Sequence, residues 1–426
     1  MSHPRKVLLI SYFYPPMNAT ACVRTGPIAK YLSKLGWKVT VVTPNPQLWR
    51  VSAIDPCAQS DASEEGIELL YTNHGWRSLS PGYLKCADHG VRGLGGKLAR
   101  GIARYAGIDR AVGWIGPVKK ACEAIERKDV DLIVASGEPG VSFNLAQLLS
   151  KKIGCPYVLD YHDLLTGNPF ASPRFARRVE QRERELVSMS SAITVVSQSW
   201  ANDLVSRFDP VSKVHVIPNG YDSDLLDSIE PEKFDHPAIV YAGCFYPPKS
   251  VITPVMAALK HCDQDDALSG RPWQFHYYGR DGEHVSREAA RFGLGRRVVI
   301  HGMLERRKAI AAVKGADACI VITSVCESLS PGDRGFITSK LYETLGAGTP
   351  IVLITPEGSE AHVMSKSYSH IARFTGDDVL GMARYFKTLI TSGVQKATAA
   401  SEYSWARITE DLDTILQGVI ESSAKK

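Results

Sequence analysis

Short apolar segments and helical patterns alternate along nearly the whole chain of 426 residues. In the first half, seven runs of aliphatic and β-branched residues are predicted strands, at 7–11, 39–43, 67–71, 131–135, 157–160, 193–196 and 214–217. Helical patterns lie between most of them, notably at 25–35, 141–152 and 174–189. Strands that are apolar on both faces are typical of a parallel sheet covered by helices on both sides. The pattern therefore predicts an α/β fold, with a Rossmann-like N-terminal domain over residues 1–220.

The same alternation begins again after an acidic, proline-containing segment at 221–237, which we interpret as an interdomain linker. Predicted strands follow at 238–242, 274–278, 298–300, 317–322 and 350–354, with helices at 251–261, 285–292 and 306–314. They predict a second doubly wound domain over residues 238–400. In the C-terminal segment 401–426, an amphipathic helix at 402–420 is expected to pack back toward the N-terminal domain. Two such domains predict a central cleft between the carboxyl ends of two parallel sheets, where these folds bind ligands.

The composition is ordinary for a globular protein, with 44% hydrophobic and 22% charged residues. The net charge of +5 is too mild to predict nucleic acid as a partner. Residues 85–120 hold most of the basic character, with eight Lys or Arg against two Asp. Apolar side chains of this segment share one helical face: Val91, Leu94, Leu98, Ile102 and Tyr105. Two interpretations fit, a helix lying on an anionic membrane surface and an acceptor-domain helix with a solvated basic face.

The cysteines and the apolar runs indicate a cellular compartment. The nine cysteines are odd in number and scattered, without a C-x-x-C pair, so a disulfide framework or a zinc site is not expected. The apolar run at 7–10 is too short for a signal peptide, and no segment approaches the ~20 apolar residues of a membrane span. We therefore predict a cytoplasmic protein, peripheral at the inner face of the membrane if residues 85–120 bind lipid.

The stretch 333–350, with the sequence DRGFITSKLYETLGAGTP, is the strongest local candidate for a ligand site. A glycine-containing loop runs into a helix, with Thr338 or Ser339 at the N-cap position. Gly346 and Gly348 are expected to end this helix before the next buried strand. The first turn of such a helix presents free N–H groups and a positive dipole end, which favour a phosphate.

Two side chains of this helix add to the predicted site. Lys340 brings a mobile positive charge to the helix N-terminus. Glu343 lies three residues further along the same face, where its carboxylate can accept hydrogen bonds from paired sugar hydroxyls. An ordinary strand–turn–helix connection is the alternative reading of the same pattern.

Nine motifs together resemble the GT-B glycosyltransferases of the retaining family 4 type, related to bacterial polysaccharide and lipid glycosyltransferases. In chain order they are KVLLISYFYPP with GPIAKYLSKLGWKVTVVT, YVLDYHDL, AITVVSQSWANDL, VHVIPNGYD, IVYAGCFYPPKSV, YYGRDGE, RVVIHGML, GADACIVI and SKLYETLGAGTPIVL. Their order and spacing cover essentially the whole chain. The resemblance implies that two Rossmann-like domains face a central cleft, with the acceptor bound by the first domain and a nucleotide-sugar donor by the second.

The resemblance implies roles for residues of the second domain. Glu343 matches the glutamate that holds the ribose hydroxyls, and the backbone at Ser339 and Lys340 matches the helix N-terminus that meets the diphosphate. Lys249 matches the basic residue that neutralises the leaving diphosphate, whose growing negative charge fixed cations stabilise. The preceding loop completes the expected donor-binding set: Gly335, Phe336, Ile337 and Thr338.

The resemblance also implies roles in the first domain. His162 and Asp163 follow a predicted strand, at the position where the family contacts the transferred sugar, and with Lys249 they are the candidate catalytic residues. A histidine here can hydrogen-bond a sugar hydroxyl or help to stabilise an oxocarbenium-like state, and a satisfied core histidine is the alternative. The predicted acceptor-side residues are Asn18, Ala19, Thr20 and Arg24.

Three positions depart from the family pattern. The usual motif is Glu-x7-Glu, and Gly335 stands where the first glutamate belongs. Glu327 takes that place if residues 328–335 are an insertion. The loop at 17–20 lacks the usual Gly-Gly pair, and Cys244 stands where relatives commonly carry a polar or basic residue. These departures leave the contacts to the donor sugar open.

The expected function is that of a retaining, metal-independent glycosyltransferase. It moves a hexosyl or hexosaminyl group from a UDP- or GDP-linked donor to a hydroxyl of a glycan or lipid-linked glycan acceptor, in cell-envelope or exopolysaccharide synthesis. The donor is a co-substrate, and no cofactor or metal is expected. The Asp-x-Asp sets at 222–224 and 411–413 do not follow strands, which argues against a metal-dependent GT-A enzyme. The alternatives are a nucleotide-sugar 2-epimerase of GT-B fold and a non-catalytic nucleotide-sugar-binding partner.

Overall fold

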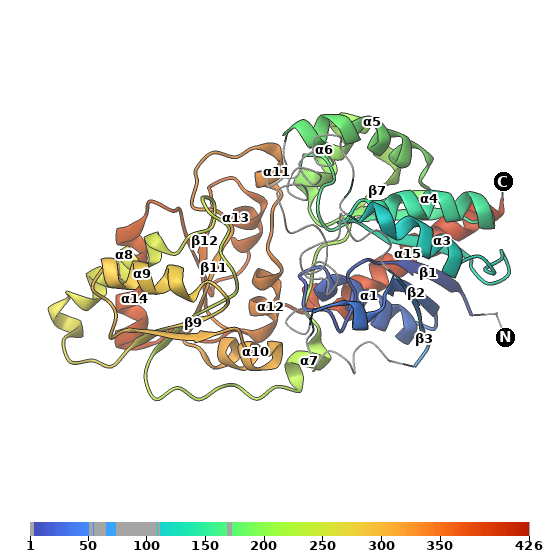
Figure 1. Cartoon of the computed structure of the whole chain (residues 1–426). Coiled ribbons are helices and arrows are strands. Elements are labelled where there is room, and N and C mark those ends of the chain that lie inside the picture. Colours follow the sequence, from blue (N-terminus) through green and yellow to red (C-terminus); the bar gives the residue numbers. More distant parts are fainter. Residues whose placement is uncertain are drawn as a thin grey trace, which may run out of the picture. The chain divides into compact units, whose positions relative to one another are not determined.

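The computed structural model describes residues 4–50, 54, 65–73, 109, 111–167 and 173–425, with the backbone alone at 173–178. The chain forms two compact units, whose elements are labelled in Figure 1. The first unit comprises Met1–Asn219 and Trp405–Lys426, and the second comprises Gly220–Ser404. The C-terminal helix is therefore part of the first unit.

Among the described residues, the first unit is built on a seven-stranded parallel sheet in the order β3-β2-β1-β4-β5-β6-β7. The strands are β1 (Lys6–Ile10), β2 (Lys38–Pro44), β3 (Ile67–Thr72), β4 (Leu132–Ser136), β5 (Tyr157–Tyr161), β6 (Ala192–Val195) and β7 (Val214–Val216). All seven predicted strands of this half are confirmed, each within one residue at either end. In the middle of the sheet, Leu9 of β1 pairs with Val41 of β2 and Val134 of β4, and all three are buried. Because the strands are parallel, their carboxyl ends share one edge, where the loops after β1, β4 and β5 meet.

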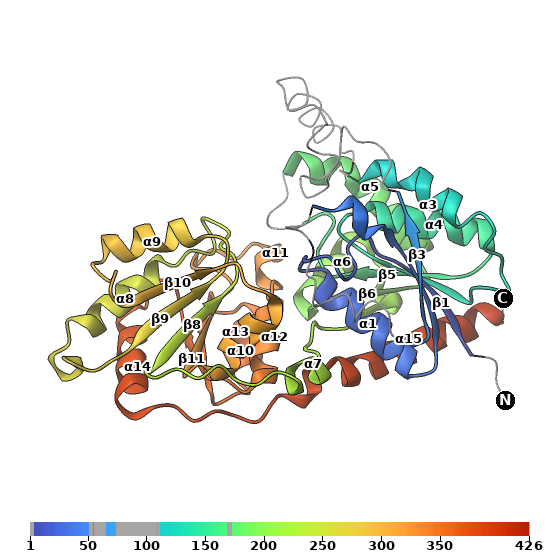
Figure 2. The same ribbon diagram turned by 60° about the horizontal axis from the view of Figure 1, so that its bottom comes forward.

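Helices cover both faces of this sheet. They are α1 (Cys22–Lys34), α3 (Ile115–Ala121), α4 (Val141–Ile153), α5 (Pro173–Met189), α6 (Gln198–Phe208) and α15 (Trp405–Ala424), with short 3-10 turns η1 (Pro46–Leu48), η6 (Val112–Trp114) and η7 (Val211–Lys213). Figure 2 shows α15 running beside α1. Trp405 and Leu412 of α15 are buried in one core with Ile28 and Leu32 of α1. Burial of each such side chain stabilises the unit by about 1.5–3 kcal/mol, which fixes the C-terminal helix on this sheet.

The second unit carries a six-stranded parallel sheet within its described residues, in the order β10-β9-β8-β11-β12-β13. The strands are β8 (Ala238–Ala242), β9 (Gln274–Tyr278), β10 (Val298–Gly302), β11 (Ala318–Ile322), β12 (Ile351–Ile354) and β13 (Ile371–Phe374). The sequence analysis did not predict β13. This edge strand has only one fully buried residue and includes Arg373, so it lacks the continuous apolar run of the others.

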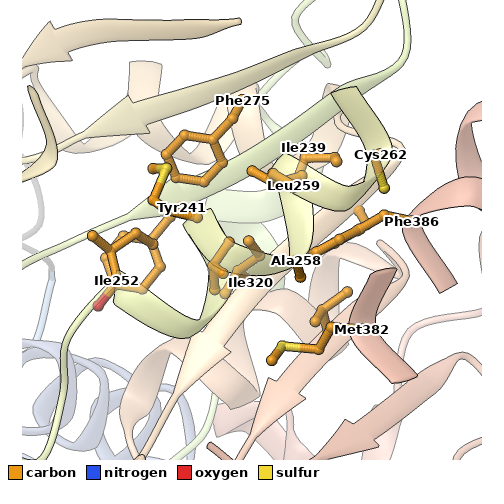
Figure 3. Packing of buried hydrophobic residues seen from close by; sticks show 14 of the residues in the cluster. Ile239, Tyr241, Ile252, Ala258, Leu259, Cys262, Phe275, Ile320, Met382 and Phe386 are labelled. Carbon is orange, nitrogen blue, oxygen red and sulfur yellow. The ribbon is translucent and has the colours of Figure 1, made fainter. Parts of the chain in front are cut away.

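The helices of the second unit pack on both faces of its sheet. They are α7 (Ser223–Asp227), α8 (Thr253–Asp263), α9 (Gly282–Arg291), α10 (Arg306–Gly315), α11 (Pro331–Arg334), α12 (Ser339–Ala347), α13 (Glu360–Ser365) and α14 (Val379–Ser392), with η8 (Asp266–Leu268) and η9 (Ser401–Tyr403). Figure 3 shows Leu259 of α8 and Phe386 of α14 packed on Ile239, Phe275 and Ile320 of the strands. On α12, Leu341 and Leu345 share a separate core cluster with Val321 and Leu353.

The acidic segment at 221–237 is packed against the second unit over much of its length. Tyr221, Leu226 and Ile229 are buried and form a cluster with Ile310 of α10. These apolar residues lie within an otherwise polar stretch, which is why the composition indicated an interdomain linker. The segment also explains Gly346: a Cβ there would lie 2.3 Å from the Tyr221 ring. Gly346 thus lies in the last turn of α12, where close packing requires a glycine, and of the two glycines predicted to end the helix it is Gly348 that does so.

Candidate functional site

The helix α12 begins at the carboxyl edge of the second sheet, as the sequence predicted. Thr338 is its N-cap residue, in an extended conformation, and its side chain makes no capping hydrogen bond. The helix ends at Gly348, whose φ of 64° is the left-handed conformation that glycine adopts readily. Because no side chain of Thr338 occupies the first turn, the N–H groups at Ser339 and Lys340 are available to an anion.

The side chain of Lys340 lies directly beneath the loop that follows β8. A Cβ placed on Gly243 would lie 2.1 Å from Lys340 Cε and Nζ, and the φ of Gly243 is +139°. The Nζ atom also lies 5.1 Å from the ring centroid of Tyr241. Burial lowers the pKa of Lys340, while the nearby carboxylates of Glu343 and Asp281 oppose this shift. Within the part of the chain that the structure describes, no carboxylate forms an ion pair with this ammonium group.

Lys249 lies in the loop between β8 and α8, and its ammonium group bonds to the carboxylate of Asp333. Asp333 belongs to the short helix α11, where it forms a capping box with Ser330. The backbone carbonyl of Lys249 accepts a hydrogen bond of 2.7 Å from Val325 N, which fixes the loop beside the carboxyl end of β11. The side chains of Lys249 and Asp333 are 24% and 12% exposed, so an anionic ligand reaching Lys249 has to share it with Asp333.

Glu343 lies one turn into α12 and pairs with Arg306, the first residue of α10. The guanidinium donates to Glu343 Oε1. A carboxylate offers about four lone-pair positions, so Oε2 can still accept hydrogen bonds from a ligand. Sequence reasoning placed Glu343 in the site but missed Arg306, because a pairing between two helices separated by 37 positions leaves no local signal.

The loop residues before α12 have different environments. Gly335 ends α11 with an ordinary φ of −92°, and Phe336 is half-buried. Ile337 is 7% exposed and packs in the apolar cluster under α12. Because the side chain of Ile337 is buried in this core, only its backbone is left for the predicted contact to the donor, which stays a prediction.

Glu327 lies at a different place from Glu343. It lines a cavity of about 340 Å³ with Glu357 and Asp377, beyond the carboxyl ends of β11, β12 and β13. Residues 331–334 of the intervening segment form α11. Among the described contacts none joins Glu327 to Glu343, and the role of Glu327 in place of the missing carboxylate stays a prediction.

In the first unit, His162 directly follows β5, as predicted. Its Nδ1 atom lies 3.0 Å from Ser136 Oγ at the end of β4, and its Nε2 atom lies 4.0 Å from Asp163 Oδ2. Burial lowers the pKa of His162 to about 4, with the carboxylate of Asp160 opposing and the guanidinium of Arg24 adding to the shift. The imidazole is therefore neutral near pH 7. The side chain of Asp163 is 36% exposed and is the more accessible of the two.

Arg24 is part of a buried network, which corrects its predicted role as an acceptor contact. It is 2% exposed, and its Nη2 and Nε atoms donate to Asp160 Oδ1 and Oδ2 at 2.6 and 2.9 Å. Its Nη1 atom donates to the carbonyl oxygen of Pro218 and to Asn219 Oδ1, at 3.0 and 3.2 Å. The guanidinium holds the Pro218–Asn219 turn, and Trp405 covers it from 5.6 Å. A charged residue inside the apolar strand YVLDY was the sequence signal for this network, because a buried carboxylate requires partners.

The loop between β1 and α1 provides the remaining acceptor-side candidates. Asn18 and Thr20 are exposed, and Ala19 is half-buried. The loop is held by a hydrogen bond of 2.9 Å from Cys22 N to the carbonyl oxygen of Ala19. The side chains at 18 and 20 are therefore accessible to a ligand, and their contact with the acceptor stays a prediction.

Most of the basic segment 85–120 lies outside the described residues, so its membrane contact stays a prediction from sequence. The described cysteines are free, and Cys57 and Cys86 lie outside the described part. In the described part no group of three or more His, Cys, Asp or Glu side chains is placed to hold a metal ion. No described helix is long and apolar enough to cross a membrane.

Comparisons with known proteins agree with this fold. A glycosyltransferase from Rickettsia africae is 14% identical, with a TM-score of 0.63 over 98% of this chain and 99% of that one. HepE of Anabaena, solved in complex with UDP and glucose, is 16% identical, with a TM-score of 0.60 over 99% of this chain and 100% of that one. A proposed UDP-N-acetylglucosamine 2-epimerase from Listeria monocytogenes is 14% identical, with a TM-score of 0.59 over 98% and 97% of the two chains. No curated protein sequence matches the chain.

The sequence itself matches one family model. The glycosyl transferase 4-like domain matches residues 21–220, which run from α1 to the Pro218–Asn219 turn and include the strands β2 to β7 of the first sheet. The two parallel sheets and the similar structures share the GT-B fold. Residues 21–220 are therefore a glycosyl transferase 4-like domain, and the chain has the GT-B fold.

Proposed function

We propose that this protein is a retaining, metal-independent glycosyltransferase that transfers a hexosyl or hexosaminyl group from a UDP- or GDP-linked donor. The donor binds the second unit at α12, and a hydroxyl of a glycan or lipid-linked glycan acceptor binds the first unit. The likeness to HepE, which was solved with UDP and glucose, supports a nucleotide-sugar donor. A role in cell-envelope or exopolysaccharide synthesis follows from the family resemblance of the sequence motifs.

The environment of Lys340 carries this proposal. Its ammonium group is desolvated beneath Gly243 and lies at the first turn of α12, where uncapped N–H groups also point. A buried cation is costly unless an anion compensates it. A diphosphate seated at this helix end supplies that anion and accepts hydrogen bonds from the N–H groups at the same time.

Other side chains complete the donor site. Lys249 exchanges its bond with Asp333 for one to the diphosphate, so that two lysines and a helix N-terminus take the role that a metal ion has in other transferases. Glu343, oriented by Arg306, accepts hydrogen bonds from the ribose hydroxyls through Oε2. His162 and Asp163 contact the sugar, and Asn18 and Thr20 contact the acceptor.

The first experiment is a thermal-shift panel of nucleotides and nucleotide sugars with the wild type, Lys340→Met and the control Lys366→Met. Lys366 is an exposed lysine at the end of α13 in the same unit. A bound donor raises the melting temperature, and the shift grows with the logarithm of its affinity. We expect a shift with UDP or GDP and their sugars for the wild type and the control, and none for Lys340→Met. Equal shifts in all three proteins would contradict the assignment of Lys340.

Transfer is then measured with the stabilising donor and glycan or lipid-linked glycan acceptors. Retention predicts that the anomeric configuration of the product, read by NMR, equals that of the donor. Metal independence predicts unchanged turnover in EDTA. The likeness to the proposed epimerase suggests a second reaction to test with the same donor. Conversion of the nucleotide sugar to its epimer without an acceptor would replace the transferase proposal with the epimerase one.

A further inference from the structure

Four hydrogen-bond donors surround the carboxylate of Asp160, which is 2% exposed. Its Oδ1 atom accepts hydrogen bonds from Arg24 Nη2 at 2.6 Å and from Thr194 Oγ1 at 2.7 Å. Its Oδ2 atom accepts hydrogen bonds from Arg24 Nε at 2.9 Å and from Ser136 Oγ at 3.2 Å. An ionised carboxylate only accepts hydrogen bonds and has about four positions for them, so these donors satisfy Asp160 completely.

Ser136 lies between this carboxylate and His162. Its Oγ atom is 3.2 Å from Asp160 Oδ2 and 3.0 Å from His162 Nδ1. A hydroxyl has one hydrogen, and a carboxylate paired with arginine is a stronger acceptor for it than a neutral imidazole nitrogen. If the hydroxyl donates to Asp160, its lone pair must accept the hydrogen of Nδ1. The second bond therefore requires the tautomer of His162 that is protonated on Nδ1.

We infer that Ser136 and Asp160 are positioning residues that hold His162 in the Nδ1–H tautomer and leave Nε2 as a hydrogen-bond acceptor for a ligand hydroxyl. The inference deepens the proposed function, on which its last step rests, by giving His162 the role of acceptor. The Nε2 atom lies 4.0 Å from Asp163 Oδ2, a separation at which one ligand can reach both atoms. Such a pair suits a ligand that brings two hydroxyl donors, as neighbouring hydroxyls of a sugar do.

The charges around His162 agree with this role. Arg24 and burial both disfavour the imidazolium, and together they lower the pKa of His162 to about 4 despite the carboxylate of Asp160. Asp160 itself stays ionised, because Arg24 and the donors from Thr194 and Ser136 offset its burial. His162 therefore enters the reaction neutral, and it accepts a hydrogen from the ligand instead of donating one.

The test is the tautomer of His162 in the ligand-free protein, read from long-range ¹H–¹⁵N NMR of protein labelled at histidine. The signal of His162 is the one lost in His162→Gln. We expect Nδ1 protonated and Nε2 unprotonated in the wild type from pH 5.5 to 8. Protonation on Nε2, or a charged ring at pH 7, would overturn the inference. The wild-type spectrum decides the tautomer, and His162→Gln serves only to assign its signal.

The hydrogen bonds from His162 through Ser136 to Asp160 are called the relay below. Two variants test whether this relay, and not the general packing around Asp160, sets the tautomer of His162. Ser136→Ala removes the acceptor of Nδ1–H and should shift the tautomer toward Nε2–H, with a fall of about tenfold in kcat/KM at unchanged affinity for free UDP. Thr194→Ala removes a donor to the other oxygen of Asp160 and should leave the tautomer of His162 unchanged. A tautomer that is the same in Ser136→Ala as in the wild type would contradict the relay.

The result is distinguishable from a failure of the proposed function, because the spectrum needs neither donor nor acceptor. An Nδ1–H tautomer in a protein that transfers no sugar supports the relay and refutes the function. Active transfer by a protein with an Nε2–H tautomer refutes the relay and supports the function.

Discussion

Replacing Asp160 by asparagine should strongly destabilise the first unit, although asparagine fills the same volume. The substitution removes the charge that compensates Arg24, and both side chains are 2% exposed. It also turns one of the two oxygens into an NH₂ group that faces donors of Arg24 or Ser136. Removing one partner of a buried ion pair typically costs about 3–5 kcal/mol, because the other charge remains buried. Loss of one neutral hydrogen bond accounts for only about 1 kcal/mol, so the charge dominates.

The assay for this prediction is hydrogen exchange with mass spectrometry along a urea series. It reports the unfolding of peptides from β1, β4 and β5 separately from those of the second unit. Asp160→Asn should lower the free energy of unfolding of the first unit by about 3–5 kcal/mol and leave the second unit unchanged. The control Thr194→Ala, which removes one donor to the same carboxylate, should cost about 1 kcal/mol. A loss below 1 kcal/mol for Asp160→Asn would refute the network as the basis of stability here.

Three further outcomes follow from other contacts. Burial raises the pKa of Glu183 to about 7, above its unfolded value near 4.5, so this group destabilises the fold as pH rises from 4.5 to 7. Glu183→Gln should therefore raise the free energy of unfolding by about 3 kcal/mol at pH 8 and by much less at pH 4.5. Urea unfolding at both pH values measures this difference. Gly243→Ala should displace Lys340 and strain a backbone with φ +139°, which lowers the free energy of unfolding by about 1–3 kcal/mol. It should also abolish the thermal shift by UDP, and a full UDP shift would contradict the close packing of Gly243 on Lys340. Asp333→Asn frees Lys249 from a partly exposed ion pair, so calorimetry should find UDP bound about two- to fivefold more tightly, whereas weaker binding would show that Asp333 supports the site.

The fold was predictable because its strands are buried on both faces. Continuous apolar runs such as 238–242 and 318–322 can satisfy burial only in a central parallel strand, and the helices between them complete the layers. The edge strand β13 was missed because only Ile371 of its four residues is buried and Arg373 is exposed, which weakens the apolar signal. The packed segment around Tyr221 was missed because its few apolar residues gain burial only from a helix that follows much later in the chain.

The candidate site was predictable in position but not in detail. The loop–helix pattern placed Lys340 and Glu343 at the start of α12, where the structure has them. Their partners come from distant segments, as Arg306 does for Glu343, and no local pattern records such a contact. Arg24 was placed with the acceptor because it follows a candidate loop, yet the buried carboxylate in β5 determines its side chain.

The most direct test of the account is the affinity of the second unit's lysine site for a nucleoside diphosphate. Isothermal titration calorimetry with UDP and GDP compares the wild type, Lys340→Met and the exposed control Lys366→Met. Losing one partner of a buried charge pair costs at least about 2 kcal/mol, so Lys340→Met should bind the preferred nucleotide at least about 30-fold more weakly. Lys366→Met should bind like the wild type. No binding of either nucleotide by the wild type, or equal affinity in Lys340→Met, would contradict the proposal that α12 is the donor site.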